Sequence, residues 1–317
     1  MRYIVKLSTP WSHDFLKRTP GGSGVFGNFR FVTDDACREC DYWVVWGGLR
    51  EATKVKCPAQ NIVYVTDESH SERRFNPEFL HQFRAVIACR QDIQHPHIIP
   101  SHDLGIWHFD KSYDEVMAMD VSHKPKTISV VSSDLTTLAG HKRRYAFVHQ
   151  LMGHFKDRMD YFGRGINPVA DKFLSLADYR YSVAVENSFI PGYFTEKIFE
   201  CFLTNTLPLY YGCPDLERFF DARAFVRIDI QDYRAALSVI EDVIKSDIHR
   251  ERLPFLREAK KTYLDRYYFF PAVAQILEAD EALKGVKSKT TQMLYPESHF
   301  QQPPLKQLYH RIKRRIR

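Results

Sequence analysis

The chain has 317 residues, 44% hydrophobic and 26% charged. One hydrophobic core rarely serves so long a chain, so we expect two domains. The composition excludes a disordered chain, a collagen and a disulfide-rich scaffold. The net charge is +6, and six basic residues without any acid lie between Leu305 and Arg317. Removing them leaves 39 basic and 39 acidic residues, so the body of the chain is neutral. We therefore expect no nucleic-acid partner, because such proteins carry their basic excess on the folded domain.

The sequence also indicates where the protein works. No stretch approaches the roughly 20 apolar residues that a membrane span requires. The N-terminal residues lack the features of a signal peptide. Six cysteines are sparse for this length and do not suggest disulfides. We expect a cytoplasmic protein.

The first third of the chain alternates short apolar runs with helical stretches. Continuous apolar runs at 3–7, 42–46, 62–65 and 85–89 predict buried strands of a parallel sheet, and 77–83 predicts a helix. This alternation indicates an open α/β sheet.

A polar segment at 120–126 reads as a linker, and a second α/β series follows it. Its predicted strands are 127–131, 159–162, 181–185, 207–211 and 225–228; its predicted helices are 141–155, 196–203, 233–244, 252–268 and 270–283. We predict two lobes, 1–124 and 125–283, followed by a spacer and tail at 284–317. The fold class is α/β, with two Rossmann-like lobes facing a cleft, since ligands of such sheets bind at the carboxyl ends of strands.

The segment 185–214 carries the most chemical information. A predicted buried strand ends at Val185, and polar residues follow it. Residues at the end of such a strand can contact a ligand. Thr195 is a suitable N-cap for a helix that begins at Glu196, and Lys197 lies in the first turn. Free N–H groups beside a lysine suit a phosphate, and a carboxylate suits sugar hydroxyls. The alternative is an ordinary capped helix whose glutamate and lysine are solvated.

This segment resembles the donor-binding signature of the family 10 glycosyltransferases, the α-1,3/1,4-fucosyltransferases. The matching residues are VENS at 185–188, GYFTEK at 192–197 and PLYYGCP at 208–214. The resemblance implies a two-lobed (GT-B) fold and inverting transfer of L-fucose from GDP-β-L-fucose to a glycan hydroxyl. The implied acceptor is an N-acetylglucosamine-type glycan, with α-1,3 linkage, or a lipopolysaccharide O-antigen. Asp134 departs from the family's asparagine, and Val185 from its aromatic residue.

The resemblance extends upstream to VVSSD at 130–134 and KRRYAFVHQL at 142–151. It implies that Arg144, or else its neighbour Arg143, binds phosphate. Arg144 and Lys197 would neutralise the diphosphate, and Glu196 would bind sugar hydroxyls. The whole donor-binding set that it implies is Arg144, Glu186, Asn187, Tyr193, Thr195, Glu196 and Lys197.

We expect no obligatory metal or other cofactor, with GDP-fucose as a substrate. The Cys37–Cys40 pair lacks a second pair of zinc ligands at suitable spacing. His95, His97 and His102 lie around prolines in a segment more typical of solvent-exposed loops.

In the first lobe, YVTDESHSERRFNP at 64–77 resembles the family's strand and catalytic loop, although His70 replaces a proline. Glu68 matches the proposed catalytic base. A partly desolvated carboxylate with a raised pKa suits proton removal from an attacking hydroxyl. The alternative is an exposed loop in which Asp67 and Glu68 pair with Arg73 or Arg74.

The tail combines charge with an apolar face. Its apolar residues follow helical spacing, namely Leu305, Leu308, Tyr309, Ile312 and Ile316. This pattern predicts that Leu305–Arg317 lies in the plane of an anionic membrane, after a flexible spacer at 296–304. The alternative is a disordered basic end.

The expected partners are GDP-fucose, a glycan acceptor and the inner face of the membrane, with peripheral attachment. Two other functions stay open. One is transfer of another nucleotide sugar by the same scaffold. The other is a non-catalytic, membrane-associated protein that binds glycans or nucleotides, although the presence of Glu68, Glu196 and Lys197 argues against a degenerate site.

Overall fold

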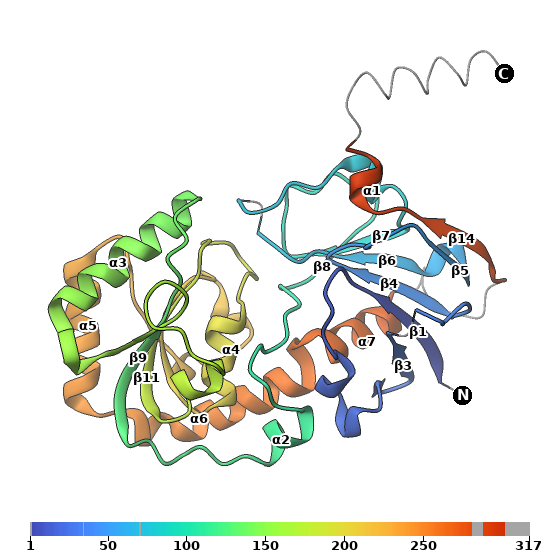
Figure 1. The fold of residues 1–317 in the computed structure, drawn as a ribbon. Coiled ribbons are helices and arrows are strands. Elements are labelled where there is room, and N and C mark those ends of the chain that lie inside the picture. The colour runs from blue at the N-terminus through green and yellow to red at the C-terminus, as the bar shows by residue number, and fades with distance from the viewer. Residues whose placement is uncertain (1, 34, 70, 281–287, 302–317) are drawn as a thin grey trace. The chain divides into compact units, whose positions relative to one another are not determined.

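The computed structural model describes residues 2–33, 35–69, 71–280 and 288–301. The chain forms two compact units. Unit 1 comprises Met1–Leu16, Gly24–Pro100 and the segment that begins at Ile276. Unit 2 comprises Lys17–Ser23 and Ser101–Gln275. Each unit is built on its own sheet (Figure 1).

Unit 1 contains a seven-stranded sheet of order β2-β3-β1-β4-β6-β7-β8. Its pairings are parallel except for the antiparallel pair β2 and β3. The strands are β1 Tyr3–Ser8, β2 Val25–Phe26, β3 Phe29–Val32, β4 Tyr42–Trp46, β6 Ile62–Val65, β7 Ala85–Ala88 and β8 Ile98–Pro100. Every residue of β4, β6 and β7 is buried, as expected for central parallel strands covered on both faces. The helix α1 is short, Pro77–Leu80, and is capped by Asn76.

A two-stranded sheet joins the C-terminal segment to unit 1. Strand β14 (Thr290–Leu294) runs antiparallel to β5 (Thr53–Cys57), with Thr290 opposite Cys57 and Leu294 opposite Thr53. The Leu294 side chain is buried in the core of unit 1. Residues 290–294 are therefore part of the folded unit, which corrects the predicted spacer from residue 284. The predicted tail, Leu305–Arg317, lies outside the described residues.

Unit 2 contains a five-stranded, all-parallel sheet of order β10-β9-β11-β12-β13. Its strands are β9 Lys126–Val131, β10 Asp160–Phe162, β11 Tyr179–Val185, β12 Leu207–Tyr211 and β13 Val226–Arg227. Its helices include α2 Tyr113–Ala118, α3 Ala139–Phe155, α4 Glu196–Leu203, α5 Tyr233–Ser246 and α6 His249–Thr262. Figure 1 shows α3 beside α5 on one side of this sheet and α4 with α6 on the other.

The remaining helices of the described chain are α7, a π-helix and several 3₁₀ turns. A π-helix, Tyr263–Tyr267, leads into α7 (Phe269–Ala279). The 3₁₀ turns are Leu16–Arg18, Pro20–Gly22, Ala59–Asn61, Lys156–Arg158, Lys172–Ser175, Leu216–Arg218, Ala222–Ala224 and Glu297–His299.

The division into units differs from the predicted boundary at residue 124, because residues 101–124 pack with unit 2. The Asp103 N–H donates to the Gly192 carbonyl (2.9 Å), and the Phe269 N–H donates to the Gly105 carbonyl (3.2 Å). The His102 ring stacks on Phe194. These contacts join residues that are far apart in the sequence. No local change in composition therefore marks the boundary between the two units.

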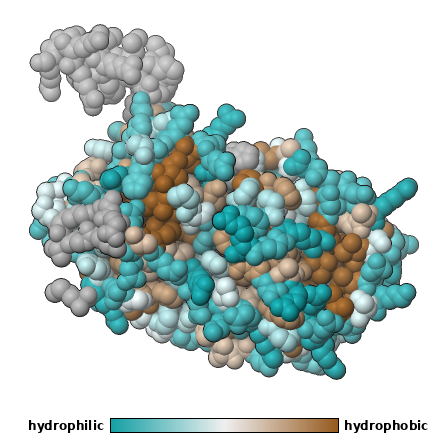
Figure 2. Space-filling model, turned by 180° about the vertical axis from the view of Figure 1, so that it is seen from behind, coloured by the Kyte–Doolittle hydropathy of each residue, from teal (hydrophilic) through white to brown (hydrophobic). Residues whose placement is uncertain are grey.

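Two units, each built on a wholly or mostly parallel sheet, confirm the predicted α/β class with two Rossmann-like lobes. The cleft between the lobes stays a prediction. Among the described residues, no helix is long and apolar enough to cross a membrane. Figure 2 shows a face on which hydrophilic side chains predominate and apolar ones form separate areas.

Candidate functional site

The site in unit 2 begins where β11 ends. Glu186 is the first residue after that strand, and it is buried, with 1% of its surface exposed. Its carboxylate accepts hydrogen bonds from the Thr195 backbone N–H (2.8 Å) and hydroxyl (2.9 Å). Gly212 must lack a side chain, because a Cβ there would lie 2.4 Å from the Glu186 Cγ. Burial raises the pKa of Glu186 above its ordinary value, although Lys197 opposes this.

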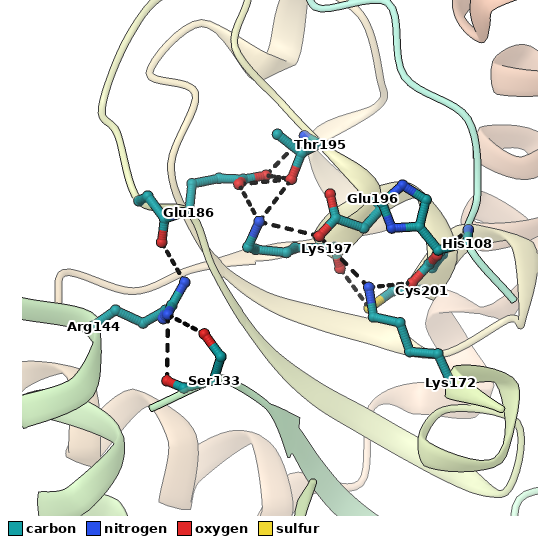
Figure 3. A network of polar contacts seen from close by, with 11 residues as sticks. His108, Ser133, Arg144, Lys172, Glu186, Thr195, Glu196, Lys197 and Cys201 are labelled. Atoms are coloured by element: carbon teal, nitrogen blue, oxygen red, sulfur yellow. Dashed lines mark hydrogen bonds and ion pairs between the residues drawn. The ribbon is translucent and has the colours of Figure 1, made fainter. Parts of the chain in front are cut away.

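Lys197 lies at the centre of the polar cluster (Figure 3). Its ammonium is 3.3 Å from Glu186 and 3.2 Å from Glu196, and it donates to the Thr195 hydroxyl (3.1 Å). Burial lowers the pKa of this lysine, but the two carboxylates outweigh burial and raise it above the usual value. Thr195 occupies the predicted N-cap position of α4, yet its hydroxyl bonds Glu186 and not the helix backbone. The lysine is therefore a fixed cation at the start of a helix.

Glu196 lies between two lysines. Lys197 is 3.2 Å from its carboxylate, and Lys172 is 3.6 Å away. Burial raises the pKa of Glu196, but these two cations outweigh it and hold the pKa well below the ordinary value. Glu196 is thus an ionised hydrogen-bond acceptor, suited to hydroxyl groups.

The structure adds residues that the sequence analysis missed. Lys172 also pairs with Glu200 at 2.8 Å. Glu200 is fully buried, and its other oxygen accepts the His108 backbone N–H at 2.7 Å. One signal pointed to it: Glu200 is an acidic residue within the buried, otherwise apolar run 198–203 of α4. Nothing in the sequence marked Lys172 or His108, which lie far from α4 along the chain.

Arg144 approaches the same strand end from α3. Its guanidinium donates to the Asn187 side-chain oxygen and to the Ser133 hydroxyl (2.9 Å) (Figure 3). Arg144 is buried, with 4% exposed, whereas Arg143 is exposed. A Cβ on Gly140 would lie 1.8 Å from the Asn187 carbonyl oxygen, so the glycine allows α3 to approach this loop. Of the two predicted phosphate ligands, Arg144 is the one beside Asn187.

Tyr193 lies in the loop between β11 and α4. It is buried, with 4% exposed, and its backbone N–H closes a turn on the Ile190 carbonyl (3.1 Å). The preceding Gly192 N–H donates to the Asp215 carboxylate (2.7 Å). The loop is therefore anchored, and a role for Tyr193 in lining the donor site remains a prediction.

Glu68 lies in unit 1, in the loop after β6. Its backbone carbonyl accepts a hydrogen bond from Arg90 at 3.0 Å, and its side chain is partly buried. Asp67 pairs with Arg73 at 2.8 Å, so this part of the predicted alternative is confirmed. The seven donor-binding candidates all lie in unit 2, at the end of β11 and the starts of α3 and α4.

Among the described residues, no group of three or more histidine, cysteine or acidic side chains could hold a metal ion. His102 is buried against Phe194 and bonds the Tyr267 carbonyl, and burial lowers its pKa to about 4. The expectation that His102 lies in a solvent-exposed loop is thus wrong. That the protein needs no metal remains a prediction.

The segment that holds these candidates matches a known family. Residues 121–266 match the family described as "Glycosyltransferase family 10 (fucosyltransferase) C-term". This segment is similar to the C-terminal domain of the family 10 glycosyltransferases. The resemblance of 185–214 is thereby confirmed, and Glu68 lies outside the matched segment.

Two curated relatives agree with this assignment. The alpha-(1,3)-fucosyltransferase FucT of Helicobacter pylori is 29% identical over 104 residues, which cover 32% of this chain and 19% of that protein. Alpha-(1,3)-fucosyltransferase B of Drosophila melanogaster is 29% identical over 112 residues, 30% of this chain and 24% of that protein. The matched segments thus span about a fifth to a quarter of these relatives.

Among solved structures, an alpha1,3-fucosyltransferase with GDP-fucose is similar at 16% identity and a TM-score of 0.46, covering 84% of this chain and 92% of that one. An alpha1,3-fucosyltransferase structure with GDP is similar at 16% identity and a TM-score of 0.48, covering 85% of this chain and 92% of that one. Both TM-scores are below 0.5, so the fold is assigned from the two sheets described above and not from these similarities.

Proposed function

We propose that this family 10 protein is an inverting fucosyltransferase that moves L-fucose from GDP-β-L-fucose to a glycan hydroxyl. The observation that carries the proposal is Lys197, a partly buried cation that Glu186 and Glu196 fix beside the end of β11, inside the segment that matches the family 10 domain. Arg144 supplies a second cation at the same strand end. Two placed cations suit a diphosphate leaving group.

In this proposal, the residues of unit 2 bind different parts of the donor. Arg144 and Lys197 bind the diphosphate and stabilise the negative charge that grows on GDP as its bond to fucose breaks. The ionised Glu196 accepts hydrogen bonds from sugar hydroxyls. Glu186 orients Thr195 and Lys197, and Asn187 and Tyr193 line the donor. These roles need no divalent metal, and transfer is expected to persist in EDTA.

Glu68 of unit 1 acts on the acceptor in this proposal. The acceptor hydroxyl oxygen bonds to the anomeric carbon, its proton passes to the Glu68 carboxylate, and the bond from that carbon to the GDP oxygen breaks. Attack opposite to the leaving group converts the β-linked donor into an α-linked product. The acceptor that we propose is an N-acetylglucosamine-type or lipopolysaccharide glycan, reached at the inner face of the membrane through the basic tail.

Calorimetry and a transfer assay test the reaction. We expect binding of GDP-fucose in preference to GDP-mannose and UDP-sugars. Glu68→Gln should lower transfer about 10²- to 10⁴-fold while donor affinity stays unchanged, because only proton removal is lost. Transfer to neither glycan type, together with no GDP-fucose binding, would refute the proposal; loss of donor affinity in Glu68→Gln would refute its role as base.

Lys197 needs a paired variant, because its removal leaves the buried Glu186 charge without a partner. The double variant Lys197→Met with Glu186→Gln removes both charges and should bind GDP-fucose at least about tenfold more weakly. Lys126→Met is the control, since Lys126 belongs to the same unit and is half exposed beside Asp160. Equal donor affinity in both variants would contradict the role of Lys197.

A further inference from the structure

The loop that carries Glu68 is tied to the far end of the described chain. The Arg73 side chain forms this connection, because it contacts three separate segments of the chain. Its guanidinium donates to the Gly47 carbonyl after β4 (2.6 Å) and to the Asp67 carboxylate (2.8 and 2.9 Å). Its other amino group donates to Glu297 (2.7 Å). One planar side chain therefore joins two strand ends to the C-terminal segment.

Glu297 uses both carboxylate oxygens. One oxygen accepts from Arg73, and the other accepts the backbone N–H of Asn76 at 2.8 Å. Asn76 is the N-cap of α1, so Glu297 holds both Arg73 and the residue that starts this helix. The Glu297 side chain is 13% exposed, which protects the ion pair from solvent screening.

The segment around Glu297 is itself firmly placed. Strand β14 precedes it and pairs with β5 over five residue pairs. The Tyr295 backbone N–H donates to Gln82 (2.8 Å), and the Gln82 side chain donates back to the Tyr295 carbonyl (3.1 Å). The Phe300 carbonyl accepts from the Asn76 side chain (3.3 Å). Glu297 is thus a rigid point against which Arg73 is fixed.

A second arginine also contacts this loop. Arg90 donates to the Glu68 carbonyl and is itself fixed by Asp92 at 2.7 Å. The guanidinium groups of Arg73 and Arg90 both lie on the Phe75 ring, at 4.6 and 4.9 Å from its centroid. The backbone around Asp67 and Glu68 is held between these arginines.

We propose that Arg73 and Glu297 are positioning residues for Glu68. They fix the loop so that the Glu68 carboxylate meets the acceptor hydroxyl in a productive geometry, and β14 with Glu297 forms part of the catalytic architecture. The inference rests on the proposed function, in which Glu68 is the general base. A displacement of about 1 Å at a catalytic group costs up to about 10²-fold in rate.

A double-mutant cycle tests the proposal. Glu297→Gln should lower kcat for transfer about 10- to 100-fold, with GDP-fucose affinity unchanged. The same substitution in a Glu68→Gln background should change the residual rate less than about twofold, because the base that it positions is already absent. Glu278→Gln is the matched control: Glu278 is a glutamate of unit 1 that accepts from Asn28 (2.9 Å), and we expect wild-type kcat.

Thermal unfolding shows whether each variant is folded.

Arg73→Lys is the second variant for the same cycle. It keeps the positive charge but loses the forked guanidinium group that joins Gly47, Asp67 and Glu297. Equal losses of kcat in the two backgrounds, or wild-type kcat in Glu297→Gln, would overturn the positioning role while fucose transfer by the parent protein stands. Absence of transfer and of GDP-fucose binding in the parent protein would instead refute the proposed function, and this inference with it.

Discussion

At the scale of single residues, two adjacent arginines differ in burial and in the contacts that they make. Arg143 is exposed, and Arg144 is buried against Asn187 and Ser133. Consecutive positions on a helix face directions about 100° apart, so only one of the two can point at the strand end. A buried guanidinium with fixed partners meets a phosphate at lower entropic cost than an exposed side chain does.

Arg144→Lys should therefore weaken GDP-fucose binding about tenfold or more, because lysine cannot reproduce the forked contacts. Arg143→Lys is the matched control and should leave affinity within about twofold. Isothermal titration calorimetry measures both. A larger loss in Arg143→Lys would show that the exposed arginine binds the diphosphate.

At the scale of elements, β14 shows how a strand far along the chain completes a unit. It pairs with β5, buries Leu294 and is followed by Glu297, which binds Arg73. Its residues TTQML carry weak strand signals, with only Leu294 buried. Tertiary pairing and not local propensity makes this segment a strand.

A chain ending at Asp280 should accordingly lose stability in unit 1. Loss of the Leu294 side chain alone costs about 2–5 kcal/mol, which corresponds to a fall in Tm of about 5 °C or more. A chain ending at Gln301 is the control and should unfold like the parent. Tryptophan fluorescence follows the transition, since Trp11, Trp43 and Trp46 belong to unit 1. Identical transitions in both truncated chains would contradict this assignment of β14.

At the scale of the whole molecule, charge separates the body of the chain from its end. The first 304 residues are electrically balanced, and all of the net +6 lies within Leu305–Arg317. Each basic residue near an anionic surface contributes about 1 kcal/mol. The sequence thus predicts an attachment that depends on the membrane charge and weakens with salt.

Deletion of residues 305–317 should reduce binding to vesicles that contain phosphatidylglycerol by about 100-fold or more. Vesicles of phosphatidylcholine alone should bind neither chain well. Cosedimentation measures binding, and GDP-fucose affinity checks that unit 2 is intact. Undiminished vesicle binding after the deletion would refute membrane attachment through the tail.

Much of unit 2 could be predicted because its signals are local. The strand that ends at Val185 and the helix that begins at Glu196 follow from continuous apolar runs and a suitable cap, and the structure has both boundaries where predicted. The donor candidates lie within a dozen residues of one another, apart from Arg144. Lys172, Glu200 and His108 escaped prediction because their contacts join distant segments.

The α/β class, most of the buried strands and the match to family 10 follow from the order of residues alone, since apolar period and motif spacing are properties of neighbouring residues. Which charges meet depends on the folded arrangement. It placed Lys197 between Glu186 and Glu196, and it brought Glu297 to Arg73. Ion pairs of this kind join residues that are far apart in the sequence. Their distances depend on the tertiary fold, and no local sequence pattern indicates them.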